Sequence, residues 1–260
     1  MPSLNLAVQL SSLRIPFKQA LLAAKRMGVA AVEVDARGEI NPRELSQTGL
    51  RQLRKHFDEL SLRVAAVGFR TRRGYDVSDE LERRVEATKE AMRFAHALGA
   101  SLVVNQVGRV PDKPEGQGWQ SLLDALADLG AYGQHVGALL AAETGSESGA
   151  DLARLIAALP AGAMAVALNP GNLIINGFAS LDAVAALGGQ IAYVRAKDAV
   201  RDLAQGRGVE VPLGRGTADF PALMGALEER SYKGAWCVER HHCDDPIREI
   251  GEAVSYLRSL

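Results

Sequence analysis

Short apolar segments recur along the whole chain, and each has the length and composition of a buried β-strand. Several are apolar at successive positions, as in "ALLAA", "AVAL" and "SLVV". Strands that are apolar on both sides are typical of a parallel sheet covered on both faces. Eight such strands are predicted, at residues 4–10, 30–36, 63–69, 101–107, 137–144, 164–170, 191–198 and 234–240.

Between the predicted strands, apolar residues recur at helical spacing. In the segment 78–100 they form one helix face, which Ser78 is expected to cap and Gly99 to end. The last helix is expected to begin with Asp245 as its N-cap and Pro246 at its first position. The chain therefore alternates strand and helix from one end to the other.

Eight strand–helix units in 260 residues predict a (β/α)8 TIM barrel, with residues 1–260 as a single domain. No linker rich in proline or glycine divides the chain. An open doubly wound sheet is the alternative that the pattern leaves. The longest connection after a strand, residues 199–218, is expected to be a loop with a role at the site, because a barrel places its chemistry after the strands.

Composition excludes several classes of function. The 30 basic and 31 acidic residues give a formal charge of -1, so nucleic acid is not an expected partner. No segment approaches the roughly 18 apolar residues of a membrane span. The chain opens on Met1, Pro2 and Ser3 without the pattern of a secretory signal, and it has only two cysteines, so we expect a cytoplasmic protein. Dinucleotide, Walker A and GxSxG motifs are absent, and no nucleotide cofactor is predicted.

Polar residues follow every predicted strand, as they do wherever a strand reaches water. Two of them are more informative, because each is a single carboxylate after an unbroken apolar run: Glu143 after "GALLAA" and Glu239 after "GAWCV". Two carboxylates near one barrel axis require a cation or a shared proton. We therefore expect both at the functional site.

Four segments in order, "AAETG", "LNPGNLI", "YVRAKD" followed by "VPLGRGTADFPAL", and "YKGAWCVER", resemble the sugar phosphate isomerase/epimerase family of xylose isomerase-like TIM barrels. The resemblance implies a divalent metal held by Glu, Asp, His and Glu after strands five to eight. It also implies that the two glutamates move a proton between adjacent sugar carbons, while positive charge stabilises the oxyanion.

Carried over residue by residue, the resemblance assigns Glu143 and Glu239 as the catalytic pair. Asn169 stands where the family has the liganding Asp, and Arg195 where it has the His. A guanidinium stays protonated and does not bind a cation. Our hypothesis is that Arg195 takes roughly the place of the metal between the two glutamates, with Asn169 making a further hydrogen bond.

A rival interpretation keeps a divalent metal (Mn, Mg, Co or Zn) on Glu143, Asn169 and Glu239, with His241 or His242 supplying the imidazole. The function implied is that of an isomerase or epimerase acting on a small ketose, polyol or sugar acid. The alternative is a non-catalytic barrel that binds a sugar or a partner protein. A homodimer is one option for its assembly.

Further residues at the strand ends are candidates for substrate binding. The "GRG" at 214–216 is a candidate anion cradle. The substrate-binding candidates beside Arg195 and Asn169 are Asn172, Lys197, Asp198, Arg70, Gln106 and His241.

Overall fold

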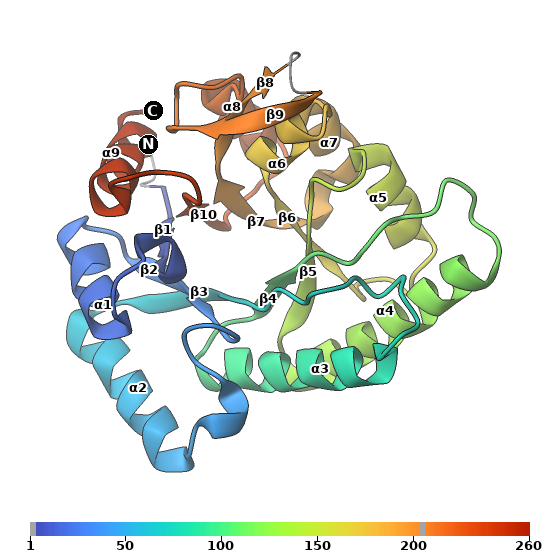
Figure 1. Cartoon of the computed structure of the whole chain (residues 1–260), viewed down its shortest axis with the longest axis horizontal. Coiled ribbons are helices and arrows are strands. Elements are labelled where there is room, and N and C mark those ends of the chain that lie inside the picture. Colours follow the sequence, from blue (N-terminus) through green and yellow to red (C-terminus); the bar gives the residue numbers. More distant parts are fainter. Residues whose placement is uncertain (1–3, 203–205) are drawn as a thin grey trace.

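The computed structural model describes residues 4–202 and 206–260. Within them, eight parallel strands form a closed barrel in the order β1-β10-β7-β6-β5-β4-β3-β2 (Figure 1). The barrel strands are β1 (Leu6–Gln9), β2 (Ala31–Asp35), β3 (Arg63–Gly68), β4 (Leu102–Asn105), β5 (Leu139–Glu143), β6 (Ala165–Leu168), β7 (Ile191–Ala196) and β10 (Ala235–Val238). The predicted barrel is confirmed, and an open sheet is excluded because β1 pairs with both β2 and β10.

Helices follow the strands and surround the barrel (Figure 1). They are α1 (Phe17–Arg26), α2 (Gln47–Leu60), α3 (Leu81–Ala97), α4 (Gln117–Val136), α5 (Gly149–Ala157), α6 (Pro170–Ile175), α7 (Ser180–Leu187), α8 (Phe220–Glu228) and α9 (Pro246–Ser259). Short 3-10 helices are η1 (Leu10–Leu13), η2 (Pro42–Glu44) and η3 (Gly188–Gln190).

Helix ends follow the sequence signals with one exception. Asp245 accepts a hydrogen bond from the Arg248 backbone N–H and caps α9, as predicted. Gly99 has a φ of +77°, the left-handed conformation expected after α3. The prediction for Ser78 is wrong, because α3 begins only at Leu81, where the preceding residue makes no side-chain cap.

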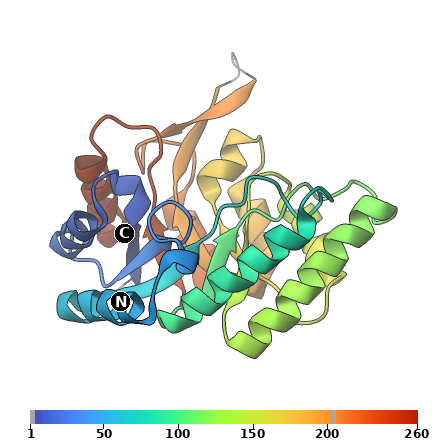
Figure 2. The same cartoon turned by 60° about the horizontal axis from the view of Figure 1, so that its bottom comes forward.

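The connection after β7 is not the irregular loop that the sequence suggested. It contains an antiparallel hairpin of β8 (Asp198–Asp202) and β9 (Arg207–Val211), which projects from one end of the barrel (Figure 2). Asp198, predicted as the last residue of the seventh strand, is therefore the first residue of this hairpin.

Mostly small side chains, together with the large ring of Tyr193, fill the lower interior of the barrel. This cluster holds Ala7, Ala31, Ala66, Val104, Ala141, Ala165, Ala167, Tyr193, Ala235 and Cys237. Because side chains alternate along a strand, the next inward positions towards the carboxyl ends lie directly above this cluster. They carry the polar residues of the site.

In the described part of the chain, no helix is both long and apolar enough to cross a membrane. Residues 1–3, on which the expectation of no secretory signal rested, lie outside the described residues.

Candidate functional site

Polar side chains from six barrel strands converge at the carboxyl end of the barrel, and all six are buried. This central cluster consists of Gln9 on β1, Glu33 on β2, Glu143 on β5, Asn169 directly after β6, Arg195 on β7 and Glu239 directly after β10. The four residues carried over from the family motifs are thus brought together. Gln9 and Glu33 join them from β1 and β2, the two strands that follow β10 around the barrel.

Asn169 links the two glutamates by hydrogen bonds. Its Nδ2 donates to Glu143 Oε1 at 2.7 Å and to Glu239 Oε1 at 2.8 Å. Its Oδ1 accepts from the Asn172 backbone N–H at 3.0 Å, which caps α6. The cap fixes the amide orientation, so both hydrogens of Nδ2 face the carboxylates.

Arg195 lies beside both glutamates, as the sequence predicted, but its strongest partner is a third carboxylate. Nη1 donates to Glu143 Oε2 at 2.9 Å and lies 3.6 Å from Glu239 Oε2. Nε and Nη2 both donate to Glu33, at 3.2 and 2.5 Å. Arg195 thus forms ion pairs with both catalytic candidates and reaches on to Glu33, while the hydrogen bonds that join the two glutamates come from the Asn169 amide.

The charges in the central cluster are largely removed from water. Burial by itself raises the pKa of Glu239, but the charges of Arg195 and Lys197 outweigh it and lower that pKa to about 2. Burial likewise lowers the pKa of Arg195, but the surrounding carboxylates raise it well above its ordinary value. At neutral pH the cluster therefore contains an ionised Glu239 beside a charged guanidinium.

Glu33 was not selected from the sequence. Burial raises the pKa of its carboxyl group, whereas Arg195 and Gln9 lower it. The effect of burial is the larger one, so the pKa of Glu33 lies above its ordinary value. The signal that identifies Glu33 is a single charge inside the apolar run "AAVEV", on the same strand face as Ala31. Because Glu33 lies within an apolar run and not after one, a pattern of polar residues at strand ends does not include it.

Lys197 and Asn172 extend the cluster on the side of β7 and α6. Asn172 Nδ2 donates to Glu143 Oε1 at 3.1 Å, and its Oδ1 accepts from Lys197 Nζ at 3.1 Å. Lys197 Nζ also lies 3.6 Å from Glu239 and 3.8 Å from Glu210, a buried residue of β9. The β8–β9 hairpin thus contributes a carboxylate to the edge of the site, a contact that the sequence pattern did not predict.

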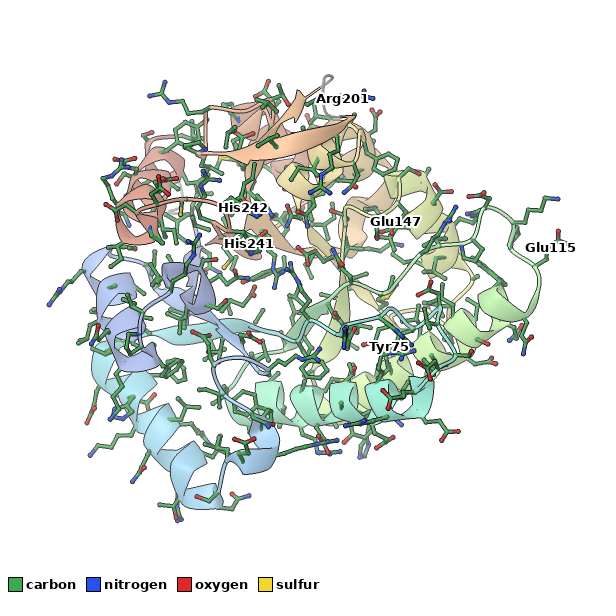
Figure 3. All side chains as sticks on the ribbon, viewed as in Figure 1. Tyr75, Glu115, Glu147, Arg201, His241 and His242 are labelled. Carbon is green, nitrogen blue, oxygen red and sulfur yellow. The ribbon has the colours of Figure 1, made fainter. Side chains whose placement is uncertain are left out.

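Two basic candidates lie at the mouth of the site. Arg70 Nη2 is 3.7 Å from Glu143 Oε2, with the side chain 54% exposed, so this guanidinium reaches both the cluster and solvent. His241 Nε2 is 3.8 Å from Glu239 Oε2, and burial lowers the pKa of its imidazole. His242, its neighbour in Figure 3, is mostly exposed and contacts Glu210. Gln106 makes no side-chain hydrogen bond to the described residues.

Asp198 has a different role from the one predicted. Its carboxylate accepts hydrogen bonds from the backbone N–H groups of Ala199, Gly214, Gly216 and Ala218, at 2.8 to 3.0 Å. The anion cradled by the "GRG" segment is therefore this side chain, and Asp198 holds the end of the hairpin connection. These four hydrogen bonds fill the acceptor positions of the carboxylate and leave none for a substrate.

The residues present do not fit a divalent metal. Asn169 turns its N–H groups, and not its oxygen, towards the glutamates. Any ion held by Glu143 and Glu239 would lie close to Arg195; at about 4 Å, a doubly charged ion and a guanidinium repel by about 8 kcal/mol at an effective dielectric constant of about 20. Within residues 4–202 and 206–260, no three His, Cys, Asp or Glu side chains are arranged to hold a metal.

Glu147, in the loop after β5, is a further buried carboxyl group (Figure 3). Its Oε1 has no hydrogen-bond partner among the described residues, and burial raises its pKa to about 7. A folded-state pKa above the unfolded value of about 4.5 means that the folded protein loses stability as the pH rises from 4.5 to 7.

Replacing Glu147 by Gln removes this titration. We expect the wild type to lose about 2 to 3 kcal/mol of unfolding free energy between pH 5 and pH 8 that Glu147→Gln does not lose. Urea unfolding at the two pH values measures the difference, with Glu82→Gln, an exposed position on α3, as the control. Equal pH slopes for wild type and Glu147→Gln would contradict the raised pKa.

With the geometry established, comparison with known proteins identifies the family. Residues 21–260 match the family model described as xylose isomerase-like TIM barrel. The chain belongs to this family. The membership inferred from the four motifs is confirmed. No curated protein matches the sequence.

Solved structures share the complete xylose isomerase-like barrel. A xylose isomerase domain protein from Planctomyces limnophilus is 22% identical, with a TM-score of 0.87 over 99% of this chain and 96% of its own. D-allulose 3-epimerase from Methylomonas sp., in complex with D-allulose, is 16% identical, with a TM-score of 0.76 over 99% and 97%. A sugar phosphate isomerase/epimerase from Parabacteroides distasonis is 12% identical, with a TM-score of 0.78 over 100% and 97%. At these identities the likeness shows the fold, and sugar epimerases are among the proteins that share it.

Proposed function

We propose that this protein is an isomerase or epimerase of a small ketose or related sugar acid with a carbonyl group, and that it works without a resident metal. The observation that carries the proposal is the pairing of Glu143 and Glu239 through one amide, with the guanidinium of Arg195 beside both. The sugar epimerases among its structural neighbours support the reaction class.

In the proposed reaction, one glutamate removes a proton from a carbon next to a carbonyl group, and the other supplies a proton to the neighbouring carbon or to the opposite face. Glu239, ionised because its pKa is about 2, is the base. The electrons of the broken C–H bond form the double bond of an enediolate, and negative charge develops on the carbonyl oxygen.

Arg195 is the proposed stabiliser of that oxygen. Its guanidinium stays charged, is shielded from water and is already in place before the charge develops, which are the conditions under which a fixed donor stabilises an oxyanion most. It supplies the positive charge that a metal supplies when present in a related barrel.

A carboxylate with a pKa of about 2 is a weak base, and the contacts around Glu239 indicate how binding can correct this. Lys197 Nζ, at 3.6 Å from Glu239, is a donor that a substrate oxygen can take over. A donor that turns from the carboxylate to the substrate raises the pKa of Glu239. The base is thereby activated only when substrate is bound.

Exchange with solvent tests the proposal. Incubated in heavy water with a panel of ketoses and sugar acids that carry a carbonyl group, the metal-free protein is expected to incorporate deuterium at one carbon position of its substrate. Glu239→Gln is expected to lower the exchange rate by about 10² to 10⁴, the usual contribution of a positioned base. Glu252→Gln, on the exposed surface of α9, is the matched control and is expected to exchange normally.

Two results would overturn the proposal. A ligand that raises the melting temperature while no member of the panel exchanges would indicate a sugar-binding barrel without catalysis. Stoichiometric divalent metal bound through Glu143 and Glu239 in the purified protein would contradict metal-free chemistry.

A further inference from the structure

Arg195 and Glu33 form a two-point ion pair across the interior of the barrel. Nε donates to Oε2 at 3.2 Å and Nη2 to Oε1 at 2.5 Å, and the two side chains are only 4% and 2% exposed. The strands that carry them, β7 and β2, are not neighbours in the barrel. The contact therefore depends on the closed fold.

We propose that Glu33 is a positioning residue, which fixes the guanidinium of Arg195 so that Nη1 faces Glu143 and Glu239. The proposal rests on the proposed function, because that function gives Nη1 its task. An arginine side chain has several rotatable bonds, and one contact at Nη1 leaves its plane free to turn. A second, parallel pair of hydrogen bonds at Nε and Nη2 defines both the position and the plane of the guanidinium.

Two neighbouring residues make this arrangement possible. A Cβ at Gly68 would lie 2.8 Å from Glu33 Oε1 and 3.3 Å from Arg195 Nη2, so any side chain at this position would displace the pair. Gln9 Nε2 donates to Glu33 Oε1 at 2.9 Å and lies 3.3 Å from Glu239 Oε2. Gln9 is itself held by Ser12, whose Oγ donates to its Oε1 at 2.6 Å.

The contacts of Glu33 assign it to positioning and not to proton transfer. Oε1 accepts from both Gln9 and Arg195, and Oε2 accepts from Arg195. Among the described residues, Glu33 contacts no side chain at the mouth of the site, whereas Glu143 contacts Arg70 and Glu239 contacts His241. Its effect on the reaction passes through Arg195.

Side-chain NMR of Arg195 tests the proposal without reference to activity. The Nε–H signal, assigned by its loss in Arg195→Lys, is expected to exchange slowly with water in the wild type. Glu33→Gln is expected to speed this exchange at least about tenfold, because it replaces a charged partner of two N–H groups by a neutral one. Glu33→Asp keeps the charge but is too short to hold both groups, and it is expected to speed exchange as well. Glu252→Gln is expected to leave the signal unchanged.

Kinetics supply the second measurement. Both Glu33 variants are expected to lower kcat for deuterium exchange by about 100-fold, the effect of a small misplacement of a reacting group, with KM little changed. Unchanged Arg195 exchange in a folded Glu33→Gln or Glu33→Asp protein would overturn the positioning role, whatever the activity. If Arg195 is loosened as expected but the wild type exchanges no substrate, the proposed function fails and the positioning role stands. If Glu33→Gln does not fold, the Arg195 exchange rate in Glu33→Asp is the test of the positioning role.

Discussion

Replacing Arg195 by Met is expected to lower the free energy of unfolding by about 3 to 5 kcal/mol at pH 8, the usual cost of removing one partner from a buried ion pair. The change leaves the carboxylates of Glu33, Glu143 and Glu239 buried without the cation that contacts all three. Methionine retains most of the aliphatic packing, so the loss reports mainly on charge. Denaturant unfolding at pH 8 measures it.

The pH dependence separates a charge effect from a packing effect. Without Arg195, burial raises the pKa values of Glu33 and Glu239 above about 4.5, the unfolded value, so the folded state binds more protons than the unfolded one. Stability then falls as the pH rises through that range, and the deficit of Arg195→Met is smaller at pH 5 than at pH 8. A deficit that is the same at both pH values would show that lost packing, and not charge, is responsible.

An exposed arginine is the matched control for this prediction. Arg248 on α9 pairs with Glu252 at the surface, where ion pairs contribute at most about 1 kcal/mol. Arg248→Met is expected to change the unfolding free energy by about 0.5 kcal/mol or less at either pH. A large effect at this position would mean that the measurement does not resolve buried from exposed charge.

The barrel and the core of the site were predictable because parallel strands in a barrel all point their carboxyl ends the same way. Glu143 and Glu239 stood out as single carboxylates after apolar strands, and the family resemblance added Asn169 and Arg195 at the ends of the two strands between them. Strand ends that share one edge of a barrel meet, so the four were expected together.

Contacts that cross the barrel or depend on a hairpin were not predictable in this way. Glu33 lies on β2, and only ring closure and register place its carboxylate against Arg195 of β7. Asp198 looked like a polar strand end facing the substrate. Only the turn into β8 shows that it binds backbone N–H groups of the following segment. Local sequence patterns specify helices and strands, whereas contacts between residues far apart in the sequence depend on the tertiary structure.

The double variant Asn169→Asp with Arg195→His is expected to bind a divalent metal that the wild type does not bind. The first change replaces an amide that donates hydrogen bonds to both glutamates by a carboxylate, which ligates cations. The second replaces the repelling guanidinium by an imidazole that can bind the ion through a neutral nitrogen. Both changes are needed, because either one alone leaves a donor amide or a positive charge at the place of the ion.

Binding is measured by calorimetric titration with Mn²⁺, and the resulting stabilisation is measured by thermal unfolding in the presence of Mn²⁺. At a Mn²⁺ concentration about 100 times the Kd, binding stabilises the double variant by about 2.7 kcal/mol, which corresponds to a rise in Tm of about 5 to 10 °C. The wild type and both single variants are expected to show no such rise, and adding Glu239→Gln to the double variant should abolish it. A folded double variant that binds no Mn²⁺ would contradict the assignment of Asn169 and Arg195 to the ligand positions of the family. If the double variant binds Mn²⁺, then either a metal ion or the fixed guanidinium of Arg195 can balance the charge of Glu143 and Glu239. The replacement of the family's Asp and His by Asn169 and Arg195 is then the exchange of one cation for the other.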